Sequence, residues 1–218
     1  MCSENDTTTD DPTAHSDDET RTGESERSAD RWLGGADVLD ARLPADLRSA
    51  LGDFVGRESV DTLGEWAAEI RRFAGDGTVD VDQLCRDDGG TDHWGTVDGE
   101  RYHFRCFYDA VVLAALEERP VDVRTVSPGG TVVEARADGR GELSVTPGAA
   151  VFSVGIATDA GERSGGDPTL EDGYAAVCPY VRAFPDREAY EQWADDAPAA
   201  TVAMPLSGAT ELADALVA

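Results

Sequence analysis

The sequence predicts an α+β protein: a small N-terminal helical unit, then a mainly antiparallel sheet with one buried helix, and C-terminal helices. Two patterns lead to this prediction. Between residues 32 and 75 apolar residues recur every three or four positions, which is the period of an amphipathic helix. Beyond Pro120 the apolar period becomes two, with Gly- and Pro-containing turns in between, as in short antiparallel strands.

Residues 1–31 consist mainly of Asp, Glu, Ser, Thr and Gly, with almost no apolar side chain. Such a segment cannot bury enough apolar surface to offset the entropy of ordering it. We therefore predict a disordered acidic tail. Cys2 lies within it, and we interpret this residue as an incidental thiol.

Residues 32–92 are predicted to form an N-terminal helical region. Its two amphipathic helices are marked by the apolar series Leu47, Leu51, Phe54 and Val55 and the series Leu63, Trp66, Ile70 and Phe73. Ser59 is the expected N-cap of the second helix, since a serine hydroxyl can accept a hydrogen bond from a free backbone N–H. Residues 79–85 are expected to add one further helical turn.

Residues 93–218 are predicted to form the second domain, which begins with a hairpin turn at Asp98-Gly99 and a buried helix over 106–116. This helix sequence, CFYDAVVLAAL, is apolar nearly all round, which is typical of a helix inside a core. The expected strands are 121–125, 131–137, 142–145, 151–156 and 201–206, with an extended segment at 174–184. Helices are expected at 186–195 and 211–217.

The formal net charge is -27, and all 18 cationic residues are arginines. A nucleic-acid-binding protein needs an excess of positive charge to neutralise phosphates, and this chain has an excess of negative charge. We therefore expect no nucleic-acid partner. Repulsion between the acidic groups would be screened within about 3 Å at molar salt. We interpret the acidity as a halophilic adaptation to a salt-rich cytoplasm.

The sequence has no run of 18 apolar residues and no basic, apolar start typical of a secretory signal. We therefore expect a cytoplasmic protein without a membrane partner. In a reducing compartment its four cysteines are expected to be thiols. Their wide spacing matches no zinc-finger pattern.

Cys106 and Asp109 are the first candidate site residues, because they are three positions apart at the start of the predicted helix. Their side chains would share one face and reach a ligand about 5–6 Å away. A helix start also favours a thiolate. The alternative is that Cys106 is a small buried hydrophobe and Asp109 a satisfied polar residue. Cys178 has the same alternative, a core thiol.

Two segments resemble the organomercurial lyase (alkylmercury lyase) family: YHFRCFYDAVVLAALEERPVDVRTVSPGG, which contains Cys106 and Asp109, and VCPYVRAFPDREAYEQWADD, which contains Cys178. The resemblance extends from about Gly95 to Ala218. Two departures stand out. Arg105 replaces an expected aromatic residue, and Ser127 stands where some members carry a further cysteine.

The resemblance implies an enzyme of mercury detoxification and mercury resistance. Cys106 and Cys178 would bind mercury, and Asp109 would lie at the metal as the acid–base group. Thiolates are the preferred ligands of a soft metal. The reaction would be protonolysis of the carbon–mercury bond of an organomercurial, giving a hydrocarbon and Hg(II). No organic cofactor is expected, whereas an exogenous thiol would remove Hg(II) and a mercuric reductase would receive it.

Two other functions are open at this stage. The first is a non-catalytic soft-metal protein that binds Cu(I) or Hg(II) through the same cysteines. The second is a regulatory domain built on the N-terminal helices. We interpret Cys85 mainly as a packing or exposed thiol and His103 mainly as a hydrogen-bonded structural residue, although either could assist at the site.

Overall fold

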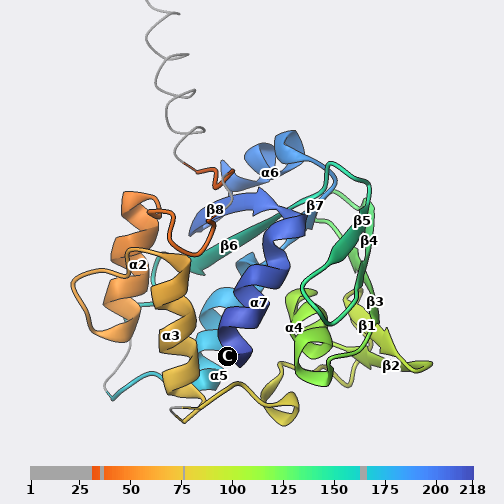
Figure 1. The fold of residues 1–218 in the computed structure, drawn as a ribbon. Helices are drawn as coiled ribbons and strands as arrows, with labels where there is room; N and C mark the ends of the chain where they lie inside the picture. Colours follow the sequence, from red (N-terminus) through yellow and green to blue (C-terminus); the bar gives the residue numbers. More distant parts are fainter. Residues whose placement is uncertain (1–30, 35–36, 76, 163–165) are drawn as a thin grey trace, which may run out of the picture. The chain divides into compact units, whose positions relative to one another are not determined.

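The computed structural model describes residues 31–34, 37–75, 77–162 and 166–218, which all belong to the unit Arg31–Ala218. The predicted acidic tail, except for Arg31, and Cys2 lie outside the described residues. Six helices and two antiparallel sheets are found in the described part of the chain. The predicted α+β class is therefore confirmed (Figure 1).

The helices are α2 (Ala45–Val55), α3 (Leu63–Phe73), α4 (Tyr108–Glu117), α5 (Leu170–Val177), α6 (Arg187–Ala194) and α7 (Ala209–Val217). Three 3-10 turns are η1 (Val81–Gln83), η2 (Cys178–Tyr180) and η3 (Leu206–Gly208). The strands are β1 (Trp94–Val97), β2 (Glu100–His103), β3 (Val121–Val126), β4 (Val132–Ala137), β5 (Leu143–Thr146), β6 (Val151–Ala157), β7 (Ala183–Phe184) and β8 (Ala199–Pro205). Every helix that the structure describes is too short or too polar to cross a bilayer.

Helices α2 and α3 confirm the two predicted amphipathic helices. Leu47 and Leu63 are fully buried, as their periodic positions require. The expected N-cap Ser59 is wrong: Thr62 caps α3, and its hydroxyl accepts a 3.2 Å hydrogen bond from the Glu65 N–H. Helix α3 packs against α5 and α7 (Figure 1). The apolar face of this N-terminal helix therefore belongs to the same core as the C-terminal helices.

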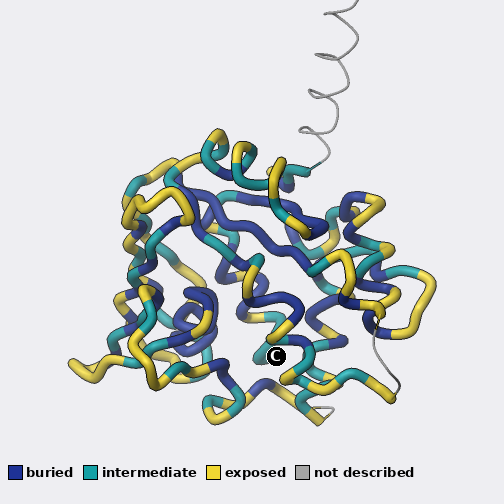
Figure 2. The backbone as a smooth tube through the Cα atoms, turned by 180° about the vertical axis from the view of Figure 1, so that it is seen from behind, coloured by how far each residue is buried: buried dark blue, intermediate teal, exposed yellow. Residues whose placement is uncertain are grey.

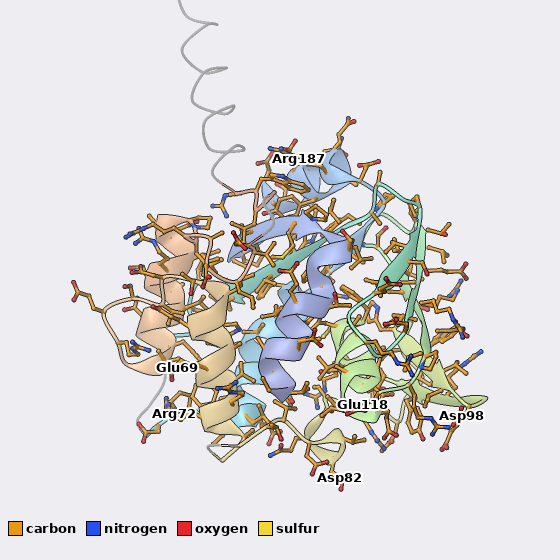
Figure 3. The ribbon with its side chains drawn as sticks, in the orientation of Figure 1. Glu69, Arg72, Asp82, Asp98, Glu118 and Arg187 are labelled. Atoms are coloured by element: carbon orange, nitrogen blue, oxygen red, sulfur yellow. The ribbon has the colours of Figure 1, made fainter. Side chains whose placement is uncertain are left out.

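The buried face of α3 also carries a charged residue, Glu69, which is 8% exposed. Its carboxylate accepts hydrogen bonds of 2.7 Å from Arg57 and 2.8 Å from Arg72. Arg72 lies one turn further along α3, next to Glu69 (Figure 3). The two guanidinium groups offset the cost of burying the carboxylate, and Arg57 ties the loop after α2 to α3.

The larger sheet has the order β2-β1-β3-β4-β5, and all of its neighbours are antiparallel. Its first hairpin turns at Asp98-Gly99, as predicted, and both residues have positive φ angles. Helix α4 packs on β1 and β3. This close packing depends on Gly95, because a Cβ at this position would lie 2.9 Å from the Ala110 Cβ.

The smaller sheet has the order β7-β6-β8 and is also antiparallel. The sequence pattern does not separate β6 from the strands before it, yet β6 belongs to this second sheet. Phe152 on one face of β6 joins the main core, whereas Val151 on the other face packs with Tyr190 of α6. Helices on both faces explain why β6 and β8 are buried along almost their whole length (Figure 2).

The expected extended segment at 174–184 is wrong over most of its length. A capping box between Thr169 and Asp172 starts α5, which runs to Val177. Pro179 cannot donate a backbone N–H to the helix, and the chain continues as η2 before the short strand β7. The predicted helices at 186–195 and 211–217 and the strand at 201–206 are confirmed as α6, α7 and β8.

Candidate active site

Helices α3, α4, α5 and α7 contribute residues to a cavity of about 70 Å³. The walls are mostly apolar and include Trp66 and Ile70 from α3, Val112 from α4, Val177 from α5, and Leu212 and Leu216 from α7. Three other lining residues carry reactive groups: Cys106, Asp109 and Cys178. The structure therefore brings together, at one apolar cavity, the three residues that the sequence analysis singled out.

Cys106 lies just before α4 rather than on it, because the helix begins at Tyr108. The expected helix start at Cys106 is therefore wrong. Backbone hydrogen bonds hold the preceding segment extended: the Phe104 N–H donates to the His93 carbonyl and the Arg105 N–H to the Cys85 carbonyl, both at 3.0 Å. Asp109 lies in the first turn of α4. Both side chains reach the cavity without sharing a helix face.

Cys178 follows α5 directly and is 6% exposed. Its sulfur lies within 4.8 Å of the Cys85 sulfur, and Cys106 lines the same cavity. The end of α5 therefore places Cys178 near two other cysteines. Among the described residues all three of these cysteines are free and buried.

Cys85 is the residue that the sequence reasoning underestimated. The Sγ atoms of Cys85 and Cys178 and a carboxylate oxygen of Asp109 all lie within 4.8 Å of one another. The Cys85 backbone N–H also donates a 3.2 Å hydrogen bond to Asp109 Oδ2. No local motif marks Cys85 in the sequence, and contacts between distant segments, including the pairing of its loop with the segment before Cys106, bring it to the site.

Asp109 is a carboxyl group suited to proton transfer near neutral pH. Burial raises the pKa of Asp109 to about 7, although the hydrogen bond from the Cys85 N–H acts in the opposite direction. Among the described residues that line the cavity, none is an arginine or a histidine. With no such cation to hold it ionised, the carboxyl group exists in both protonation states near pH 7.

The thiols are in different electrostatic situations. Hydrogen bonds to the sulfurs of Cys106 and Cys85, together with burial, raise the pKa of Cys178 well above its usual value. The same hydrogen bond from Cys178 lowers the pKa of Cys85. This difference favours a proton on Cys178 and a thiolate at Cys85.

Two tyrosines of the cavity wall fix its surroundings. The Tyr108 hydroxyl donates a 3.0 Å hydrogen bond to the Ala209 carbonyl at the start of α7. The Tyr174 hydroxyl donates to the Gln83 carbonyl, two residues before Cys85. Burial raises the pKa of both phenols, so they act as neutral donors that connect the helices and the Cys85 loop.

The other residues considered in the sequence lie apart from the cavity. Nδ1 of His103 is 3.0 Å from the carbonyl oxygen of Thr91, a structural hydrogen bond. The Ser127 hydroxyl oxygen accepts a 3.0 Å hydrogen bond from the Thr131 N–H. Arg105 is exposed, and its backbone N–H donates to the Cys85 carbonyl.

Buried thiols beside a protonatable carboxyl group define a class of site suited to a soft metal ion and proton transfer. The family model described as MerB: Alkylmercury lyase matches residues 88–218. The chain belongs to the alkylmercury lyase family. Cys106, Asp109 and Cys178 lie within the matched residues, whereas Cys85 lies before them.

Among solved structures, the chain is similar to one described as the crystal structure of the mercury-bound form of MerB2. The two share 17% sequence identity with a TM-score of 0.45, and the similarity covers 58% of each chain. The chain therefore spans less than two thirds of that relative's length. No curated protein matches the sequence.

Proposed function

We propose that the protein cleaves the carbon–mercury bond of organomercurials by protonolysis, releasing a hydrocarbon and Hg(II). The observation that carries the proposal is the convergence of Cys106, Cys178 and Asp109 on one apolar cavity in a chain of the alkylmercury lyase family. The apolar walls suit the organic group of the substrate. The thiols suit its mercury atom.

In the first step a thiol of the site replaces the anionic ligand of the organomercurial. A mercury–sulfur bond forms, the bond to the departing anion breaks, and the thiol proton is left over. Asp109 is the carboxyl group of the site that can take this proton, since its oxygen lies within 4.8 Å of the Cys178 sulfur. With a pKa of about 7, Asp109 is basic enough to accept this proton and acidic enough to donate it later to carbon.

In the second step the other thiol releases its proton to solvent, and its thiolate binds the same mercury atom and adds electron density to it. The carbon–mercury bond breaks, its electron pair stays on carbon, and the proton from Asp109 forms the new carbon–hydrogen bond. Per turnover, one organomercury cation and two thiols give one hydrocarbon, one dithiolate-bound Hg(II) and one released proton. The reaction involves no oxidation or reduction and needs no organic cofactor.

Product release requires a competing ligand, because two buried thiolates hold Hg(II) tightly. A small exogenous thiol supplies one, and a mercuric reductase is the matching downstream acceptor. The -27 formal charge fits a halophilic protein working in a salt-rich cytoplasm. The physiological role that follows is detoxification of organomercurials.

The test is benzene release from a phenylmercury salt in the presence of excess small thiol. We expect the wild-type protein to release benzene above the no-protein background and Cys106→Ser and Cys178→Ser to fall to that background. Asp109→Asn should slow turnover about 10²–10⁴-fold, the usual contribution of a general acid, yet still bind Hg(II). Cys2→Ser, the matched cysteine control, should retain full activity.

Two results would overturn the proposal. One is a wild-type rate equal to the background. The other is a Cys106→Ser, Cys178→Ser double variant that is as active as wild type. Tight Hg(II) binding without any benzene would instead identify the non-catalytic soft-metal protein that uses the same cysteines.

A further inference from the structure

Cys85 is a buried cysteine that the family match does not include. It lies three residues before the first matched residue and is 6% exposed. A structural role alone would be filled by any small apolar residue in contact with apolar neighbours. Cys85 instead has the Cys178 thiol and the Asp109 carboxyl group next to its sulfur. Both groups belong to the proposed mercury site, so a third ligand at this position would face the same ion.

We propose that Cys85 is a third mercury ligand, so that Cys85, Cys106 and Cys178 together hold the metal in a three-sulfur site. The proposal rests on the proposed function for the presence of mercury at the site. It goes beyond that function because two thiols and one carboxyl group suffice for protonolysis. It also assigns a role to a residue outside the matched part of the chain.

The distances suit a single ion. Three sulfurs around one soft metal, each bonded at about the 2.3 Å of a zinc–thiolate bond, would lie roughly 4 Å apart, and slightly more for a larger ion. The Cys85 and Cys178 sulfurs are within 4.8 Å of each other, and the Cys106 thiol is near enough to Cys178 to raise its pKa. The Cys106 side chain lines the same cavity as Cys178, so the proposed site requires it to turn toward the other two sulfurs when the ion binds.

Two hydrogen bonds fix the backbone of Cys85 and a third fixes the chain just before it, so the residue is in place before mercury arrives and only its side chain needs to turn. Its N–H donates to Asp109, and its carbonyl accepts from the Arg105 N–H. Two residues earlier, the Gln83 carbonyl accepts from Tyr174, a residue of the cavity wall. A ligand fixed in this way loses little conformational freedom on binding.

The binding step conserves atoms and charge. Hg(II) bound to the thiolates of Cys106 and Cys178 accepts the Cys85 sulfur, a third mercury–sulfur bond forms, and any thiol proton leaves. No electrons are transferred. The product is an anionic mercury trithiolate, from which a monothiol should remove Hg(II) less easily than from a dithiolate.

The experiment is mercury-edge X-ray absorption on the full chain with one equivalent of HgCl₂, which counts sulfur neighbours and measures mercury–sulfur bond lengths. All samples carry Cys2→Ser, so that Cys2 contributes no sulfur. We expect three sulfurs with Cys85 present, and two sulfurs at a shorter distance in Cys85→Ser and in Cys85→Ala. In competition with a small dithiol, both Cys85 variants should bind Hg(II) with at least tenfold lower affinity than the protein that retains Cys85.

Two sulfurs in the protein with Cys85 present would overturn the proposal, and this measurement needs no Cys85 variant to fold. Three sulfurs in Cys85→Ser would overturn it as well. Benzene release is scored separately. A protein that releases benzene but binds mercury through two sulfurs contradicts the three-sulfur site alone, whereas a three-sulfur site without benzene release contradicts the lyase function alone.

Discussion

The backbone N–H of Cys85 donates a 3.2 Å hydrogen bond to Oδ2 of Asp109. This contact ties the loop after η1 to the first turn of α4. It partly offsets the burial that raises the pKa of Asp109 to about 7. The carboxyl group is therefore positioned by the backbone of Cys85 and lies within 4.8 Å of the Cys85 and Cys178 sulfurs.

The stability of the protein should carry a pH dependence due to Asp109. Its pKa is higher in the folded state than its ordinary value of 3.8, so its contribution to stability is fully present below that value and is lost as pH rises through about 7. Between about pH 5 and about pH 8 the wild-type protein should lose on the order of 2–3 kcal/mol from this group. Asp109→Asn, which does not titrate, should lose none of it.

Urea unfolding of wild type and Asp109→Asn at both pH values, at constant salt, measures this difference. Subtracting the two profiles removes the contribution of the many other acidic groups. If the unfolding free energies of wild type and Asp109→Asn change equally with pH, the carboxyl group is solvated in the folded protein.

His93 should have the opposite effect on the acid side. Its ring accepts a 2.9 Å hydrogen bond from Arg182 at Nε2 and lies 2.6 Å from the Thr125 hydroxyl at Nδ1. Burial and the Arg182 charge lower its pKa to about 4, so its stabilising contribution is present above pH 6.5 and is lost as pH falls toward 4. Between about pH 7.5 and about pH 5 the loss should be roughly 2 kcal/mol, and His93→Gln should abolish it in urea unfolding. An unchanged acid profile in the variant would contradict this assignment.

Tyr174→Phe should loosen the loop that carries Cys85, because it leaves the Gln83 carbonyl without its donor. We expect a loss of about 1–3 kcal/mol and faster alkylation of Cys85, measured by mass spectrometry after limited reaction. Tyr108→Phe is the matched control. It also removes a tyrosine hydrogen bond, to Ala209, and should cost similar stability without exposing Cys85. Equal Cys85 alkylation rates in the two variants would argue against a specific role for Tyr174.

Gly95→Ala should disturb the packing of α4 on the larger sheet. The added Cβ would lie 2.9 Å from Ala110 Cβ and 3.0 Å from Val121 Cγ1, and overpacking of this kind costs about 1–3 kcal/mol. Gly77→Ala is the control, since its Cβ would meet nothing within 4 Å. Urea midpoints should separate the two variants, and equal midpoints would show that α4 can move away freely.

Periodicity and turn residues predicted most of the helices and strands, because these elements depend on local spacing of apolar side chains. The prediction was wrong around Cys178. The apolar residues after Tyr174 suggested an extended segment, whereas the Thr169–Asp172 capping box starts helix α5. The division into two sheets was also missed, since strand pairing is set by contacts between distant segments. The convergence of Cys106 and Cys178 was anticipated through family resemblance. The position of Cys85 was not, because it depends on contacts with residues distant in the sequence.

The central claim is that this site delivers a solvent-derived proton to carbon through Asp109. The most direct measurement is the isotopic composition of benzene released from a phenylmercury salt in D₂O, with wild-type protein and with Asp109→Asn. The account predicts benzene carrying one deuterium from wild type and almost no product above background from the variant. Unlabelled benzene from wild type, or an Asp109→Asn rate equal to that of wild type, would contradict it.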